Sequence, residues 1–140
     1  MAINFANITL ELFDASSNST PDFFVNLNGI SFSKKVLEDM NYPQYVQFLI
    51  SAEHNIFAVR VCKGNDAKAV PFSKPKAEQQ ANLAMSNKTL HDVLKKMIPN
   101  SDERKRYKIT GEYDSNTKTM FFEMKTAVSV PYRGSKELVE

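Results

Sequence analysis

The sequence lacks the residues on which several common chemistries depend. Its one cysteine, Cys62, excludes an intrachain disulfide and a zinc site built on cysteines. Its four glycines form no glycine-rich phosphate loop of the Walker or dinucleotide type. No run approaches the ~18 apolar residues that a membrane-spanning helix needs. We therefore expect no membrane partner and no small-molecule cofactor.

The beginning of the chain indicates a compartment. Met1 to Asn7 has neither the basic start nor the apolar run of a secretory signal peptide. A single thiol without such a segment is typical of a reducing environment. We expect a cytoplasmic protein.

The two histidines offer little for catalysis or metal binding. His54 lies in a polar stretch between two apolar runs, which is typical of a solvated turn residue. His91 falls within a predicted helix beside Asp92, where a surface position and an acid–base role both stay open. A pair of Cys62 with a histidine also stays open, but Cys62 ends an alternating strand pattern, where cysteines act as small hydrophobes. We expect no enzyme and no metal site.

Length and composition fit one globular domain. The chain has 140 residues, of which 42% are apolar and 24% charged, which argues against wholesale disorder. Lysine plus arginine number 18 and aspartate plus glutamate 16, for a net charge of +2. That total is too small to indicate a nucleic-acid or membrane partner by itself.

Apolar periodicity predicts a series of strands and two short helices. Apolar residues at helical spacing predict one helix over residues 34–40, after Ser33, and a second helix that follows Ser86 and ends at Met97. Both serines have the chemistry of an N-cap. Alternating or short apolar runs predict strands at 3–13, 23–27, 30–32, 45–50, 56–62, 69–72, 83–85, 107–113, 119–125 and 128–130. Residues 14–22 form a polar loop.

The order of these elements recurs within the chain. Residues 23–62 and 83–125 each predict a strand, a serine-capped helix, a proline stop and a hairpin, with 63–82 as connector and 126–140 as tail. The fold prediction is a single α+β domain of two similar β-α-β-β units about a pseudo-two-fold. The alternative is chance recurrence of common elements.

The first unit resembles a known family. Val25 to Met40, followed by the hairpin at 45–62, resembles the AbrB/MraZ-type swapped-hairpin transcription regulators, in which a strand runs through a glycine into an alternating piece, a short helix and a hairpin. Gly29 stands at the matching glycine. The resemblance implies a swapped-hairpin barrel and DNA binding. Ile30 stands where the family has an arginine, and Ser33 where it has a proline.

Basic residues cluster in two places. The candidate DNA contacts are Lys34, Lys35, Lys95, Lys96, Arg104, Lys105, Arg106 and Lys108. Clustered cations bind phosphates; the alternatives are lysines favoured by a helix C-terminus and solvated loop charges. If the DNA interpretation holds, we expect the two groups to form one continuous positive face.

The aromatic residues predict a second covered face. Adjacent strand residues point to opposite sides, so one member of each pair Phe23–Phe24 and Phe121–Phe122 must leave the main core. A helix, the other unit or a partner chain would cover it; a base-stacking platform is the alternative.

The apolar pattern also predicts a core, and two functions remain. The predicted core is Ile8, Leu10, Leu12, Val25, Leu27, Ile30, Phe32, Val36, Leu37, Met40, Val46, Phe48, Ile50, Phe57, Val59, Val61, Leu90, Val93, Leu94, Met97, Ile109, Met120, Phe122 and Met124. The first function is a DNA-binding regulator. The alternative is a protein-interaction module of the same fold that does not bind DNA. Duplex DNA and a second copy of the chain are the partners considered.

Overall fold

The structure is a computed structural model that describes residue 9 and residues 20–78, 82–102 and 104–130. The predicted strand at 3–13, with Ile8, Leu10 and Leu12, lies outside the described residues. The elements in chain order are β1 (Asp22–Val25), β2 (Ile30–Phe32), α1 (Lys34–Asp39), β3 (Tyr45–Ser51), β4 (Ile56–Cys62), β5 (Val70–Pro71), β6 (Leu83–Met85), α2 (Lys88–Met97), β7 (Arg106–Asp114), β8 (Thr119–Glu123), the 3-10 turn η3 (Met124–Thr126) and β9 (Val128–Val130).

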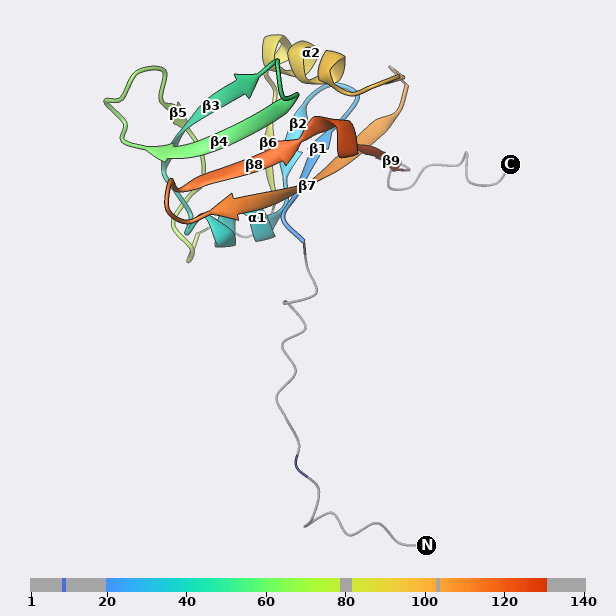
Figure 1. Ribbon diagram of the computed structural model, residues 1–140. Coiled ribbons are helices and arrows are strands. Elements are labelled where there is room, and N and C mark those ends of the chain that lie inside the picture. The colour runs from blue at the N-terminus through green and yellow to red at the C-terminus, as the bar shows by residue number, and fades with distance from the viewer. Residues whose placement is uncertain (1–8, 10–19, 79–81, 103, 131–140) are drawn as a thin grey trace, which may run out of the picture.

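The described strands form one curled sheet. Their order is β5-β3-β4-β8-β7-β1-β2-β6, with β9 beside β7, and every pairing is antiparallel. The sheet curls into a half-barrel, and α1 and α2 lie at opposite ends of it (Figure 1). The prediction of a small α+β domain rich in antiparallel strands is confirmed.

Strand β7 joins the two parts of the sheet. Its first half pairs with β1 on one side and β9 on the other, and its second half pairs with β8. Gly111 lies where β7 passes from β1 to β8, and its amide donates to the carbonyl of Pro21 at 2.7 Å. A Cβ at Gly111 would lie 2.6 Å from Cε1 of Phe122, so glycine is what lets this ring pack against β7.

A cluster of phenylalanine rings fills the inside of the half-barrel. The ring of Phe32 lies 5.0 Å from that of Phe23 and 5.1 Å from that of Phe72, between ring centres. Phe23 and Phe122 are buried, whereas Phe24 and Phe121 point outward. The prediction that one member of each phenylalanine pair leaves the core is confirmed.

Three predicted core residues are exposed instead. Leu27 lies in the β1–β2 turn because β1 ends at Val25, Ile50 stands beside the β3–β4 turn, and Val93 is on the solvent side of α2. The core instead takes in side chains that the apolar pattern did not predict, because their neighbours in the fold come from distant strands. They are Phe23, Phe72, Ile98 and Tyr107.

Both helices begin where predicted, but their caps differ from the prediction. Ser33 is the N-cap residue of α1, yet its hydroxyl accepts from the amide of Asp22 at 3.0 Å and makes no cap to the helix. The start of β1 lies alongside and takes up this hydroxyl. For α2 the N-cap is Asn87 rather than Ser86, and its Oδ1 accepts from the amide of Leu90 at 3.0 Å.

Candidate functional site

A basic groove lies at the end of the sheet covered by α2. Its volume is about 960 Å³, and it runs between α2, the β1–β2 turn and the segment after α2. Three of the residues predicted to contact DNA, Lys95, Lys96 and Arg104, line this groove. The lining residues are Leu27, Asn28, Lys88, His91, Asp92, Lys95, Lys96, Ser101 and Arg104.

Helix α2 supplies one wall of the groove. Side chains three or four positions apart share a helix face, which brings Lys88, Asp92 and Lys95 to the same side. Lys88 Nζ lies 3.3 Å from Asp92 Oδ2, and the hydrogen bond from Lys88 lowers the pKa of Asp92 below its ordinary 3.8. Asp92 is therefore ionised at neutral pH. Its single negative charge is outnumbered by the lysines and the arginine that line the groove.

The segment after α2 supplies the opposite wall. Ser101 Oγ donates to the carbonyl of Lys95 at 2.9 Å, and the amide of Asp102 donates to Tyr107 Oη at 2.7 Å. The amide of Arg104 donates to Asp102 Oδ1 at 2.8 Å, which is the main cause of a lowered pKa for Asp102. These bonds fix the backbone of the segment while the side chain of Arg104 stays 90% exposed. Arg104 is thus held at the rim, where its Nε also lies 3.4 Å from Asp102 Oδ1.

His91 links α2 to the β1–β2 turn. Its Nε2 lies 2.6 Å from the carbonyl oxygen of Asn26, and because a carbonyl only accepts, Nε2 donates. Its Nδ1 lies 3.7 Å from Asp92 Oδ1, and the side chain is only 12% exposed. A surface position for His91 is therefore wrong, and its ring holds the wall of the groove.

The remaining residues of the second basic group continue from the groove along β7. Lys95 Nζ donates to the carbonyl of Lys105 at 3.1 Å, which joins the helix to the start of β7. Arg106 Nε donates to Asn26 Oδ1 at 2.7 Å, and its guanidinium carbon lies 4.3 Å from the ring centre of Phe24. Lys108 stands opposite Phe24 in the sheet. The structure thus brings Lys95, Lys96, Arg104, Lys105, Arg106 and Lys108 together.

The first basic group lies elsewhere. Lys34 lies beside the start of β1, because the amide of the preceding Ser33 donates to the carbonyl of Asp22. The groove lies at the other end, where Arg106 binds Asn26 just beyond the end of β1. Four strand residues span about 13 Å. Lys35 is also paired with Asp39 at 3.0 Å. Lys34 and Lys35 therefore lie at the other end of β1 from the groove.

The groove contains residues that sequence reasoning missed. Lys88, Asn28 and Ser101 line it, and none was predicted as a site residue. The helical spacing of Lys88, His91 and Lys95 is a signal that could have added Lys88. No local pattern places Asn28 there, because it reaches the groove only where the β1–β2 turn contacts α2, whereas Ser101 is held to α2 by its own bond to Lys95.

The other sequence candidates are placed as follows. His54 is exposed in the turn between β3 and β4, which confirms a solvated turn histidine. Desolvation raises the pKa of Cys62, which disfavours the thiolate that a nucleophile needs. The described residues include no group of three or more metal-ligating side chains, and none of their helices could cross a membrane.

Together these features define a class: a small antiparallel α+β domain with a basic groove beside its second helix. Comparison with protein-family models, curated proteins and solved structures finds no match.

Proposed function

We propose that this chain is a non-enzymatic protein that binds duplex DNA through phosphate contacts in the basic groove, as a transcription regulator of the type that the resemblance implies. One observation carries the proposal: Lys88, Lys95, Lys96 and Arg104 surround one groove in which Asp92 is the single carboxylate among the lining residues that the structure describes. Cations gathered in this way release counterions when they contact phosphates, which favours binding.

The chemistry of the lining favours backbone contacts over base reading. Lysine acts as a point charge toward phosphate, and Arg104 can bind two phosphate oxygens at once. The amide of Asn28 and the hydroxyl of Ser101 add neutral donors. Lys88 also stands at the positive end of α2, whose first turn holds no acidic residue. We expect modest, sequence-tolerant and strongly salt-dependent affinity.

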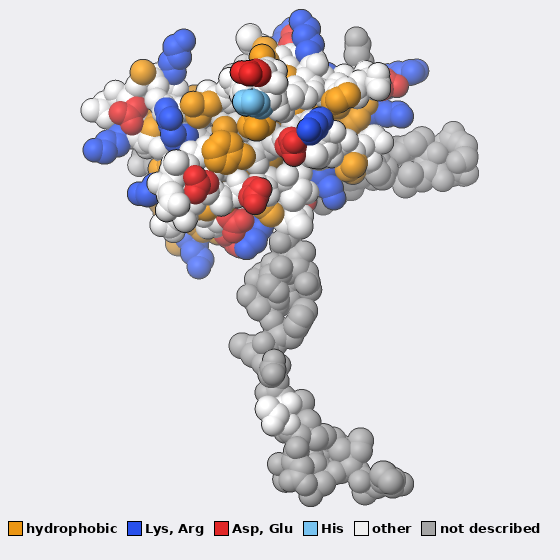
Figure 2. Space-filling view, in the orientation of Figure 1, with side chains coloured by type: hydrophobic (Ala, Val, Ile, Leu, Met, Phe, Trp, Pro, Cys, Tyr) orange, Lys and Arg blue, Asp and Glu red, His pale blue; other side chains and the backbone are white. Residues whose placement is uncertain are grey.

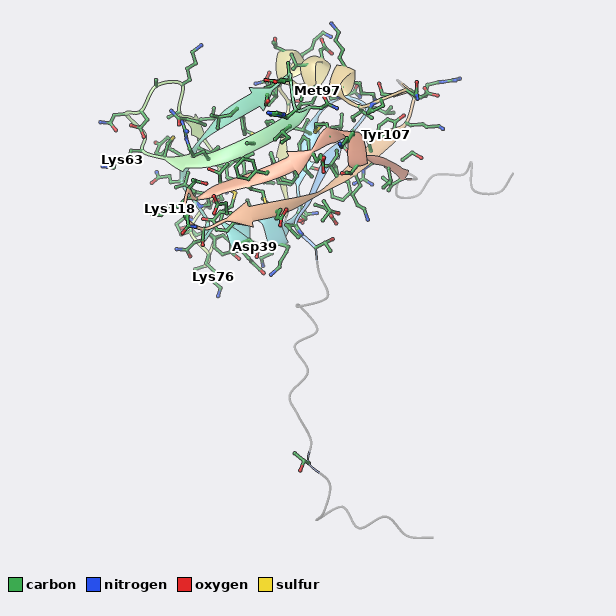
Figure 3. The ribbon with its side chains drawn as sticks, viewed as in Figure 1. Asp39, Lys63, Lys76, Met97, Tyr107 and Lys118 are labelled. Atoms are coloured by element: carbon green, nitrogen blue, oxygen red, sulfur yellow. The ribbon has the colours of Figure 1, made fainter. Side chains whose placement is uncertain are left out.

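The test is a fluorescence anisotropy titration of a labelled mixed-sequence duplex at two salt concentrations. The variant Lys96→Glu with Arg104→Glu reverses two exposed charges of the groove. Arg106 is left unchanged because its bond to Asn26 supports the fold. The control Lys63→Glu with Lys76→Glu makes the same change in net charge away from α2 (Figure 3).

The expected outcomes separate the groove from net charge. The groove variant loses affinity, and its log–log salt slope falls by about 0.9 for each lost phosphate contact. The control variant, which lowers the total charge equally, keeps most of the wild-type affinity at the higher salt. If wild type does not bind at low salt, or if both variants bind like wild type, the DNA proposal fails. The alternative, an interaction module without DNA binding, then takes its place; the exposed Phe121 on the outer sheet face favours it.

We also propose that the chain is built from two similar units about a pseudo-two-fold, with exchanged strands as in the swapped-hairpin family. The strand registers support this proposal. Ala58, the third residue of β4, pairs with Phe121, the third residue of β8. Ser31, the middle of β2, pairs with Ala84, the middle of β6. Both registers are those of a strand meeting its own equivalent.

Two hydrogen bonds at the hairpin turns also support it. Asn55 and Lys118 each end a turn with positive φ, at 56° and 54°. The carbonyl of Asn55 accepts from the amide of Met124 at 3.0 Å, and that of Lys118 accepts from the amide of Val61 at 3.0 Å. The turn of the first hairpin is therefore bonded just after β8, and the turn of the second hairpin is bonded near the end of β4. In the same way β1 pairs with β7, and β5 with β3. On this proposal the second unit begins at β5, within the predicted connector 63–82, and each unit lends its first strand to the other unit's hairpin.

A further inference from the structure

The outer face of β3, β4 and β8 has an apolar centre, where a solvated sheet face is usually polar; its other residues are Gln47, Ser51, Arg60, Thr119 and Glu123. The register places Leu49, Ala58 and Phe121 side by side in one row across these strands, with Ile56 in the adjacent row. Phe121 is 39% exposed although it occupies the centre of the sheet. Hydrophobic side chains are visible across the middle of this face in Figure 2. We call these four residues the outer patch.

We propose that the outer patch binds the outer patch of a second copy of this chain. Charges at its two ends favour this occupant. Arg60 stands in the row on one side of the Ala58–Phe121 pair, opposite Thr119, and Glu123 stands in the row on the other side, opposite Ile56. The patch therefore carries a cation at one end and, at the other, the carboxylate of Glu123, which lies 3.2 Å from Lys125 Nζ of the same chain; Glu112 of β7 extends the central row beside Phe121.

The two ends of the patch are complementary to each other, whereas the two Glu112 side chains face each other across the axis. A two-fold axis that runs across the strands at the Ala58–Phe121 pair turns each row onto its opposite, so Arg60 of one copy lies over the Ile56–Glu123 row of the other. The contact occurs twice, as the symmetry of an isologous dimer requires. Within one chain Arg60 donates to the neutral amide oxygen of Gln47, at 2.8 Å from Nη2 and 3.2 Å from Nε. A carboxylate of the second copy adds a stronger, charged partner.

The size of the face sets the strength of the dimer. Four strands of about seven residues cover roughly 20 Å by 20 Å. Such a face is at or below the small end of stable protein interfaces. We therefore expect a dimer with a dissociation constant on the order of 10–100 μM, formed without nucleic acid.

The experiment is sedimentation velocity on the full chain over a concentration series, in buffer without nucleic acid. Phe121→Glu places a charge in the centre of the patch and should weaken dimerisation at least about tenfold. Val93→Glu is the matched control, because Val93 on α2 is 37% exposed, close to the 39% of Phe121. The control should dimerise like wild type, and circular dichroism verifies that both variants are folded.

A charge exchange tests the orientation of the two copies independently. Arg60→Glu alone places two carboxylates together and should weaken the dimer, and Glu123→Arg alone should weaken it by placing cations together. The double variant exchanges the charges and should recover most of the affinity. If the wild-type chain stays monomeric up to about 1 mM, the proposal is overturned. The outer patch then either stays exposed to solvent or binds a different partner. A dimer that Phe121→Glu leaves intact, or single and double charge variants that behave alike, also overturns it.

Discussion

Gly111 lies directly against the ring of Phe122: a Cβ at this position would stand 2.6 Å from Cε1 and 2.9 Å from Cδ1. Phe122 is fully buried among other phenylalanines and has no room to move away. We expect Gly111→Ala to lower the free energy of unfolding by about 1–3 kcal/mol through overpacking. Urea denaturation measures this loss.

Gly64→Ala is the control for that prediction. A Cβ at Gly64 would meet only the ring of Tyr45, at 3.0 Å, in an exposed loop. We expect a change within about 0.5 kcal/mol. Equal losses in the two variants would show that the contact with Phe122 does not govern the loss at Gly111.

Phe32 is the ring around which the aromatic cluster is arranged. It lies within 5.0–6.5 Å of the rings of Phe23, Phe48, Phe57, Phe72 and Phe122. Phe32→Ala should cost about 3–5 kcal/mol of unfolding free energy, because surrounding rings from separate strands cannot collapse into the cavity. Leu37→Ala, in the buried face of α1, should cost about 2–5 kcal/mol. A loss below about 1 kcal/mol for Phe32→Ala would contradict the packing described.

The cap of α2 can be tested by a neighbouring pair of substitutions. Asn87→Ala removes the acceptor of the Leu90 amide and should cost about 1 kcal/mol, whereas Ser86→Ala, one residue earlier, should be near neutral. Thermal denaturation of both variants checks this. The reverse order of the two losses would assign the cap to Ser86.

Asp92→Asn separates charge from stability in the basic groove. It removes the one carboxylate among the described residues that line the groove, so affinity for duplex DNA should rise, in the direction opposite to Lys96→Glu with Arg104→Glu. A variant that acted only by loosening α2 would bind more weakly. Anisotropy at one fixed salt concentration distinguishes these outcomes.

The same variant has a pH-dependent effect on stability. The folded pKa of Asp92 is lowered, so its ion pair with Lys88 stabilises the fold above the ordinary pKa of 3.8, and this stabilisation is lost as the pH falls through the folded pKa. The melting temperatures of wild type and Asp92→Asn should differ slightly at pH 7 and converge as the pH falls below the lowered pKa of Asp92. A difference that persists at low pH would have a cause other than the carboxylate charge.

Local patterns predicted the local elements well. Alternation located the hairpin of β3 and β4, and helical spacing located α2, because these depend on neighbours in the sequence. The order of strands could not be read in this way. The pairing of β1 with β7 depends on residues far apart in the chain, and so does the contact of the β1–β2 turn with α2 that brings Asn28 to the groove.

The predicted site was recovered in part for the same reason. Lys95, Lys96 and Arg104 follow one another closely in sequence and share the groove. Lys34 and Lys35 were joined to them by an assumed symmetry, and the fold places that pair at the other end of β1. The apolar pattern of the sequence predicts that Leu27 and Ile50 are buried. Both are exposed to solvent, because they lie at turns at the end of the sheet.

The hydrogen bond from Thr110 Oγ1 to Asp22 Oδ1 joins residues that are 88 positions apart in the chain. It lies within the pairing of β1 with β7, which joins the two parts of the sheet. During synthesis β1 emerges from the ribosome early. One of its edges can pair with β2 at once, but the other edge stays unpaired until β7 has been made. Loop closure over such a distance slows folding, so this domain should fold in milliseconds to seconds rather than microseconds. In that interval the first hairpin stands with β4 unpaired along one side, which makes the newly made chain most open to aggregation before β7 and β8 are complete.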